Sequence, residues 1–219
     1  MVIEDMLYLV NPVGLSQFVE YSLNSETVLH FVNLEHDPPQ MLTPTDESTL
    51  KSELREIQKL FSTVFPIEAT SNNLETTAEI NEPLVDSPVN LIDSDVVDLS
   101  SCLHDTEVTI PTLNGWLLGY PVVYLFSKKQ IKQAIDNLST KFLSIFQITV
   151  RRNVVADQAS EPEELLSFSV PCELSMGGRS EPWAEAFLMR IQEKWENCRS
   201  VWRSVKMEVW ESYPQAIVL

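Results

Sequence analysis

The sequence predicts an α+β fold: a single mixed, largely antiparallel sheet with two longer packed helices and a disordered acidic insertion. Its segments run in the order strand, strand, helix, insertion, strand, helix, strand, strand, helix, strand. Hydrophobic residues make up 44% of the 219 residues, enough for a substantial core. The length favours one domain, residues 1–219, interrupted by the insertion.

The N-terminal part predicts two strands. Residues 2–10 are strand-like from the start, and Asn11-Pro-Val-Gly14 has the composition of a turn. Residues 27–34 are rich in β-branched and aromatic side chains, which is typical of a strand. We expect this strand to end before Asp37-Pro-Pro39.

A helix is predicted from about Thr43. Thr43-Pro-Thr-Asp46 combines a capping hydroxyl, a proline suited to the first turn and an acid three residues on. Apolar residues then recur at helical spacing and predict one buried face, formed by Leu50, Leu54, Ile57, Leu60, Phe61 and Val64.

The insertion spans residues 67–108 and is acidic throughout. Between Glu68 and Glu107 it carries ten Asp and Glu residues and no Lys or Arg. It is also rich in Ser, Thr, Asn and Pro and poor in aromatic residues. Such a segment buries too little apolar surface to offset its ordering entropy, so we expect it to be flexible.

The C-terminal half predicts the remaining elements. Residues 116–126 form the most hydrophobic run; Gly119 and Pro121 mark a bend before a strand that is buried on both faces. A short helix follows at residues 128–138, and strands are expected at 142–150, 165–170 and 205–209. Ser180 is the expected cap of a helix whose buried face holds Trp183, Phe187, Leu188, Ile191, Trp195 and Cys198. The apolar end, residues 216–219, is expected to dock on the protein.

Charge and cysteine usage restrict the classes of function. The net charge of -17 is unfavourable for phosphate backbones, so no nucleic-acid partner is expected. No apolar run reaches the length of a membrane span, and the acidic start is unlike a signal peptide. Three cysteines at unrelated spacings favour a reducing compartment. We therefore expect a cytoplasmic or nuclear protein.

No strong catalytic motif is present, and no cofactor or metal is predicted. Two weaker groups of residues keep an enzyme open: the paired acids Glu4 and Asp5, and Glu35-His-Asp37, where an imidazole lies beside carboxylates. They would suit a divergent hydrolase or nucleotide-handling enzyme if they converged in one pocket. The simpler interpretation is solvated acids at strand ends.

The sharpest signal lies inside the insertion. Asp95, Val96, Val97, Asp98 and Leu99 form an aliphatic run among acids, followed by Ser100. Such a segment can add itself as a strand to the sheet edge of a partner. The pattern resembles SUMO-interacting motifs, in which two or three aliphatic residues flank an acidic position. The alternative is that the run packs on the protein's own surface.

Two longer stretches resemble a known family. They are Ile3–Val10 with Phe31–Glu35, and Gly115–Tyr124 with Leu166–Pro171. Both resemble an uncharacterised vertebrate family that includes the product of human chromosome one open reading frame seventy-four. The resemblance implies that further residues precede Met1, and it implies no activity. Because no strong catalytic motif is present, we expect a soluble intracellular protein that is non-enzymatic and acts through protein–protein contacts, with the acidic insertion as the partner-binding element.

Overall fold

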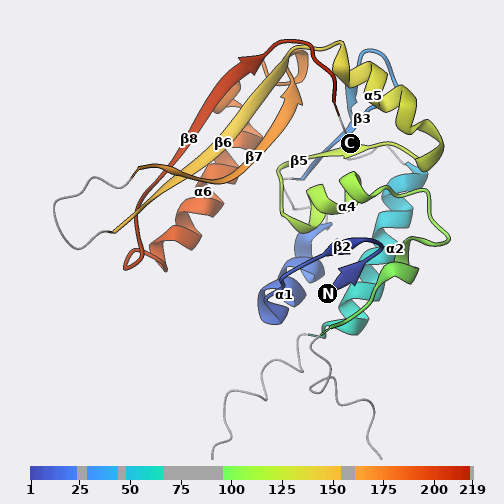
Figure 1. The fold of residues 1–219 in the computed structure, drawn as a ribbon, viewed down its shortest axis with the longest axis horizontal. Coiled ribbons are helices and arrows are strands. Elements are labelled where there is room, and N and C mark those ends of the chain that lie inside the picture. Colours follow the sequence, from blue (N-terminus) through green and yellow to red (C-terminus); the bar gives the residue numbers. More distant parts are fainter. Residues whose placement is uncertain (24–28, 44–47, 67–95, 154–160, 218–219) are drawn as a thin grey trace, which may run out of the picture.

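The fold is α+β, as predicted, in the computed structural model (Figure 1). The structure describes residues 1–23, 29–43, 48–66, 96–153 and 161–217. Its strands form three sheets, with the orders β1-β2, β4-β3-β5 and β7-β6-β8, rather than the single sheet expected. Helices pack between and beside these sheets, and the two halves of the chain meet in the middle sheet, where β3 pairs with β5.

The first segment is a hairpin followed by a helix, and not the predicted strand and turn. β1 (Val2–Ile3) pairs antiparallel with β2 (Met6–Leu7), and helix α1 covers Pro12–Ser22. The Asn11 side chain accepts a hydrogen bond from the backbone N–H of Gly14 at 3.0 Å, and a proline occupies the first turn. The Asn-Pro pair therefore starts a helix here.

The middle sheet is the centre of the molecule. β3 (His30–Asn33) pairs antiparallel with β4 (Gln40–Met41) and parallel with β5 (Val122–Leu125). Helix α4 (Ile110–Leu117) leads into β5, and the 3-10 turn η2 (Lys128–Gln130) and α5 (Ile131–Ser139) follow it. The predicted bend lies at Gly119, whose φ is 71°. The apolar run from residue 116 thus begins in a helix.

Helix α2 covers Thr49–Val64 and buries the predicted face through Leu54, Ile57 and Phe61. It begins later than the sequence indicated. Its N-cap residue is Ser48, so Thr43 is not the cap, and residues 44–47 lie outside the described residues.

The third sheet consists of long strands. β6 (Leu143–Arg152) lies between β7 (Glu163–Pro171) and β8 (Trp202–Ser212), antiparallel to both. Helix α6 (Pro182–Glu196) covers one face of this sheet. Its N-cap is Glu181; Ser180 belongs instead to the turn η4 (Gly178–Ser180). Ile217, near the C-terminus, packs on the core as predicted.

Two hydrophobic clusters meet at the middle sheet. Val32 and Val122 belong to the cluster shared with the third sheet and α6, whereas Phe31, Val123 and Leu125 face the cluster formed with α1, α2 and α4. The prediction that β5 is buried on both faces is confirmed.

Part of the predicted insertion belongs to this second cluster. Leu99 and Leu103, in and beside the turn η1 (Ser100–Leu103), are buried, although order was expected to return only near Val108. Residues 67–95 lie outside the described residues.

Candidate functional site

The aliphatic run predicted to bind a partner lies against the protein's own hairpin. The Val2 N–H donates to the Val97 carbonyl, and the Leu99 N–H donates to the Val2 carbonyl, both at 2.8 Å. Leu99 is only 5% exposed, whereas Val96 is 55% exposed. Asp95 lies outside the described residues. The structure thus shows the self-packed arrangement that the sequence left as an alternative.

Asp98 has a local role in this arrangement. Its carboxylate accepts hydrogen bonds from the Ser100 backbone N–H at 2.9 Å and from the Ser100 hydroxyl at 2.6 Å. These bonds stabilise the charged form and lower the pKa of Asp98. The Ser100 hydroxyl in turn accepts from the N–H of Glu4, which connects the run to the β1–β2 turn.

The structure does not bring the weaker catalytic candidates together. Glu4 and Asp5 are exposed in the β1–β2 turn, whereas His36 and Asp37 follow β3 on the other side of α4. Asp37 pairs with Lys141 at 2.8 Å. Within the described ranges, no group of three or more His, Cys, Asp or Glu side chains could hold a metal ion.

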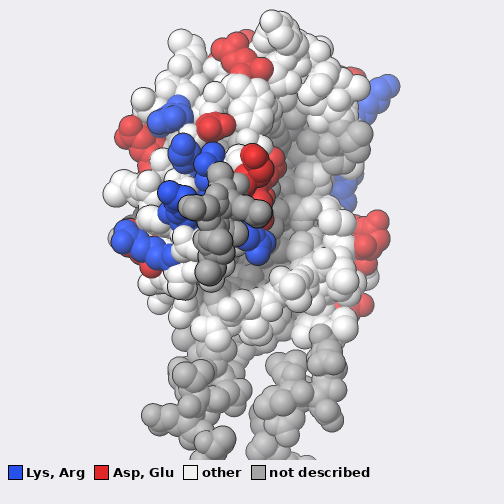
Figure 2. Space-filling model, turned by 60° about the vertical axis from the view of Figure 1, so that its left-hand side comes forward, with Lys and Arg blue, Asp and Glu red and all other residues white. Residues whose placement is uncertain are grey.

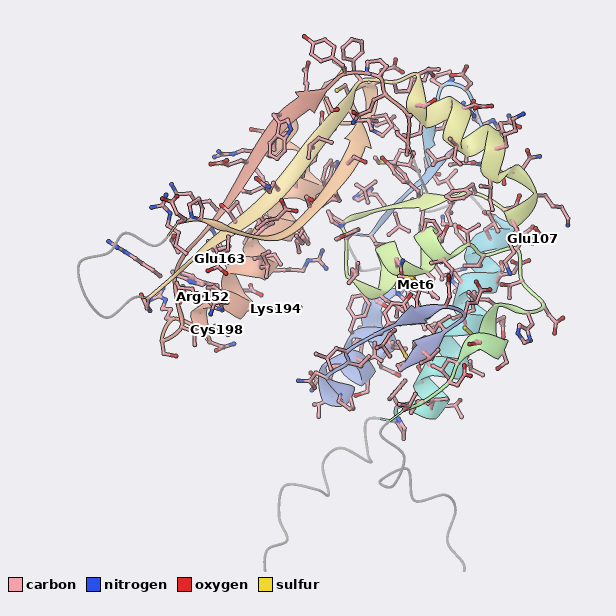
Figure 3. The ribbon with its side chains drawn as sticks, viewed as in Figure 1. Met6, Glu107, Arg152, Glu163, Lys194 and Cys198 are labelled. Carbon is pink, nitrogen blue, oxygen red and sulfur yellow. The ribbon has the colours of Figure 1, made fainter. Side chains whose placement is uncertain are left out.

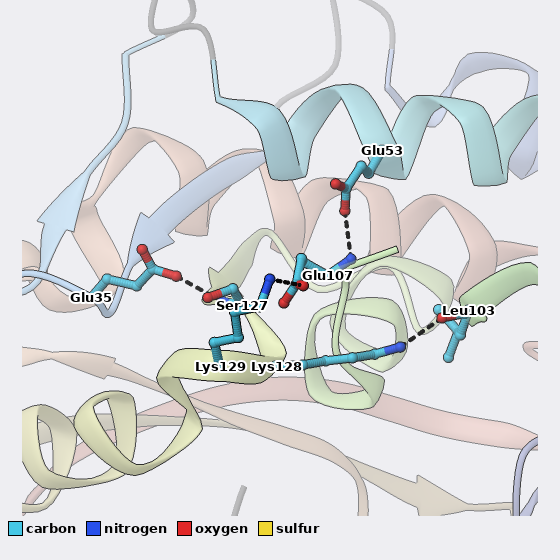
Figure 4. A network of polar contacts seen from close by, with 7 residues as sticks. All are labelled: Glu35, Glu53, Leu103, Glu107, Ser127, Lys128 and Lys129. Atoms are coloured by element: carbon cyan, nitrogen blue, oxygen red, sulfur yellow. Dashed lines mark hydrogen bonds and ion pairs between the residues drawn. The ribbon is translucent and has the colours of Figure 1, made fainter. Parts of the chain in front are cut away.

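A charged network lies where the parallel strands β3 and β5 end (Figure 4). Glu35 accepts from the Ser127 N–H at 2.8 Å, and Glu53 accepts from the Glu107 N–H at 2.8 Å. Glu107 pairs with Lys129 at 2.5 Å, which lowers the pKa of Glu107. These contacts connect α2, η2 and the segment before α4, so their role is structural.

The described thiols are not arranged as nucleophiles. Burial raises the pKa of Cys102 to about 11, so it is a neutral thiol near pH 7. Cys172 accepts a hydrogen bond from the Ser144 hydroxyl, and Cys198 is exposed after α6 (Figure 3).

A concave surface lies between α1, the end of α4 and α6. Its main compartment has a volume of about 350 Å³ and lies beside a second compartment of about 160 Å³. Both compartments share Phe18, Gly119 and Arg190, so they form one continuous surface, which we call the α1–α6 groove. Its walls are mainly apolar, formed by Leu9, Leu15, Phe18, Leu117, Leu118, Phe187 and Ile191.

Large apolar side chains around this groove are unusually exposed. Leu9 is fully exposed at 105%, and Tyr21 and Leu118 are 61% and 58% exposed. Single exposed apolar residues are ordinary, but a group of them beside a concave surface is typical of an interaction site.

Two cations from α6 point into this apolar surface. Arg190 and Lys194 are one helical turn apart and both line the groove; Figure 3 shows Lys194 near the end of α6. The Arg190 guanidinium lies 5.7 Å from the centre of the Phe187 ring. Although Arg190 as a residue keeps an exposed surface, loss of water around its guanidinium lowers its pKa.

The charge of the groove is opposite to that of the protein. The chain has 32 Asp and Glu residues, yet none of the described residues that line either compartment is acidic. Within the part of the chain that the structure describes, neither Arg190 nor Lys194 forms an ion pair. The groove therefore offers two unpaired positive charges beside apolar walls.

Comparison with known proteins identifies the family. A family model described as a domain of unknown function (DUF4504) matches residues 1–219. The chain belongs to this family. No curated protein and no solved structure matches it. The closer relationship to the human open-reading-frame product stays a prediction.

The groove was not predicted from the sequence, although one half of it has a sequence signal. Phe187, Arg190, Ile191 and Lys194 follow the spacing of one helix face, so two cations interrupt an otherwise apolar stripe. The other half of the groove is formed with α1, where the sequence predicted a turn. None of the described helices is long and apolar enough to cross a membrane.

Proposed function

We propose that this protein is a non-enzymatic interaction protein whose α1–α6 groove binds an acidic, apolar segment of a partner protein. The observation that carries the proposal is the pair of unpaired cations, Arg190 and Lys194, on an apolar surface free of described acidic residues. A partner with carboxylates beside large apolar side chains complements both features.

The surroundings of Arg190 favour a carboxylate partner. Its guanidinium is partly desolvated, and among the described residues it contacts the Phe187 ring but forms no ion pair. A carboxylate placed there would form a charge-assisted hydrogen bond in a poorly solvated site, where such bonds are strongest. Apolar side chains on either side of that carboxylate would cover exposed Leu9 and Leu118.

The test uses a fluorescent peptide of sequence ELDDLFEELL and the whole chain. We expect the peptide to bind and the affinity to fall as salt is added, because exposed ion pairs are screened. The double change Arg190→Glu and Lys194→Glu should weaken binding about tenfold or more, equivalent to ~1.4 kcal/mol. Fluorescence anisotropy measures the affinity, and circular dichroism confirms that the variant is folded.

The double change Arg55→Glu and Lys132→Glu is the charge-matched control, because both residues are exposed, on α2 and α5, and line neither compartment. Its affinity should change little beyond the effect of net charge. The proposal is wrong if a peptide with Lys at every acidic position binds equally well, or if the double variant binds like the native chain. Binding of dodecanoate without binding of the peptide would indicate a small amphipathic anion as the ligand and also contradict the proposal.

We propose a second binding element at the aliphatic run, residues 95–99. Val96 is exposed, and the adjoining backbone of Val97–Leu99 is already paired in the manner of a strand with Val2. Binding to a SUMO-like sheet edge would require Leu99 to leave the core, so the whole chain should bind more weakly than the isolated segment.

A peptide spanning residues 91–102 and the whole chain are titrated separately into isotope-labelled SUMO, and the NMR shifts are followed. Shift changes with the peptide that shrink with the whole chain would support the second element. Unchanged spectra at near-millimolar peptide would end it.

A further inference from the structure

The outer edge of β8 is long, and no described strand covers it. β8 runs over 11 residues and pairs with β6 along one side. No other described strand pairs with its second side, and Figure 1 shows β8 as the outermost strand of its sheet. An exposed edge of this length presents a row of unpaired N–H and C=O groups, which natural proteins cover, shorten or protect with charges.

The side chains of β8 alternate between the two faces. Met207 is buried, and Val205 and Val209 pack beside it on the core under α6. Lys206 and Glu208 are exposed on the opposite face, as is Trp210, at 44%. Figure 2 shows the molecule turned so that this side comes forward, with acidic and basic side chains interspersed on the protruding part of the surface.

We propose that the edge of β8 binds the same edge of a second copy of this chain. The two strands would run antiparallel, with the two-fold axis passing between the two Met207 residues. Lys206 then lies opposite Glu208 of the second copy, within the part of β8 that pairs regularly with β6. Symmetry repeats this contact, so the interface contains two pairs of opposite charges.

The charge pattern favours this register over its neighbours. Shifting the two-fold to residue 206 places two Lys206 side chains opposite each other, and shifting it to residue 208 does the same for Glu208. Like charges directly opposite are unfavourable, whereas opposite charges stabilise an antiparallel pair. In the proposed register Val205 also faces Val209 on the inner side, so apolar residues meet apolar residues.

The proposed register agrees with the geometry of an antiparallel ladder. Alternate residues of β8 turn their N–H and C=O groups away from β6. Residues 206 and 208, like residues 205 and 209, direct their N–H and C=O groups to the same side of β8, so each pair can lie opposite each other in an antiparallel ladder. The hydrogen bonds of the two edges can therefore form, and the result is a continuous sheet of order β7-β6-β8-β8-β6-β7.

The charges that would pair are available for a partner. Within the part of the chain that the structure describes, neither Lys206 nor Glu208 forms an ion pair. The β6 neighbours of Lys206 and Glu208 are the uncharged residues Thr149 and Gln147. By contrast, another charged residue of this sheet already has a partner within the chain, since Arg152 pairs with Glu163 at 2.8 Å (Figure 3).

The experiment measures the mass of the intact chain by sedimentation over a series of concentrations. We expect a dimer at high concentration that dissociates on dilution. Lys206→Glu alone, or Glu208→Lys alone, should weaken the dimer about tenfold or more, because two attractive contacts become repulsive. The double exchange of Lys206→Glu with Glu208→Lys should restore it.

The most specific test of the register mixes two variant chains. The Lys206→Glu chain and the Glu208→Lys chain each repel themselves but complement each other at both contacts. An equimolar mixture should therefore form a dimer while each chain alone is weakened. Quenching or a wavelength shift of Trp210 fluorescence, tested against Trp210→Phe, should accompany the change.

Glu193→Lys on the exposed side of α6 is the matched control, since it changes the net charge as Glu208→Lys does. A native chain that remains monomeric at the highest attainable concentration would overturn the proposal. A native dimer that Glu208→Lys and Glu193→Lys affect equally would also overturn it. The groove proposal is independent, because no β8 residue lines the groove.

Discussion

Trp116 shows how one buried side chain depends on its neighbours. Its ring is fully buried and packs edge-on against Phe61, with ring centroids 5.7 Å apart. Its indole N–H donates to the Ser22 hydroxyl at 2.7 Å. The end of α1 thus supplies the acceptor for the one polar group of the Trp116 side chain.

We expect Ser22→Ala to destabilise the protein by about 1–3 kcal/mol, because the buried indole N–H would lose its acceptor. Urea unfolding measures the difference. Ser16→Ala is the matched control: Ser16 is also buried in α1, but its hydroxyl donates only to the Val13 carbonyl. Equal losses in the two variants would contradict the argument.

At the scale of elements, helix α4 packs closely against strand β5 in the middle of the molecule. Gly115 lies against Val123, and a Cβ at Gly115 would meet Val123 Cγ1 at 3.2 Å. A methyl group at this point would therefore require Val123 to shift by a few tenths of an ångström, although alanine is the better helix former.

Gly115→Ala should therefore destabilise the protein despite its favourable propensity, since overpacking costs about 1–3 kcal/mol. The loss should shrink in a chain that also carries Val123→Ala, which removes the opposing methyl groups. A double-mutant cycle by thermal unfolding measures this coupling. Additive effects would show that the two residues do not limit the packing.

The elements that the sequence predicted best are those with a repeated pattern. Helix α2 and strands β6, β7 and β8 have periodicity over many residues, so their existence was clear. Helix α1 was missed because Asn11-Pro12 serves equally in a turn and at a helix start. Helix α4 was missed because its residues are apolar on almost every side, which hides the helical period.

For the whole molecule, the middle sheet joins the two hydrophobic clusters. Its strands have side chains in both, and the Tyr124 hydroxyl donates to the Ser169 carbonyl at 2.8 Å, connecting β5 with β7. The sheet is thus a shared wall between the part that carries α1 and α2 and the part that carries α6.

Charge is also distributed over the whole molecule. From Met1 to Glu107 there are 20 acidic residues against Lys51, Arg55 and Lys59, whereas residues 108–219 contain equal numbers of acids and bases. All residues of the two proposed contacts that carry positive charge, on α6 and β8, lie in the balanced part. The acidic excess therefore lies away from both of them in the sequence.

The sequence by itself determined the α+β class, the long periodic elements, the double-sided burial of β5 and the uneven charge. These properties depend on local pattern and composition, which a chain carries before it folds. Only the tertiary structure decided that the strands separate into three sheets, that Leu99 returns to the core and that Arg190 meets the ends of α1 and α4. Those outcomes depend on which apolar faces find each other across long sequence separations, and no local pattern specifies that choice.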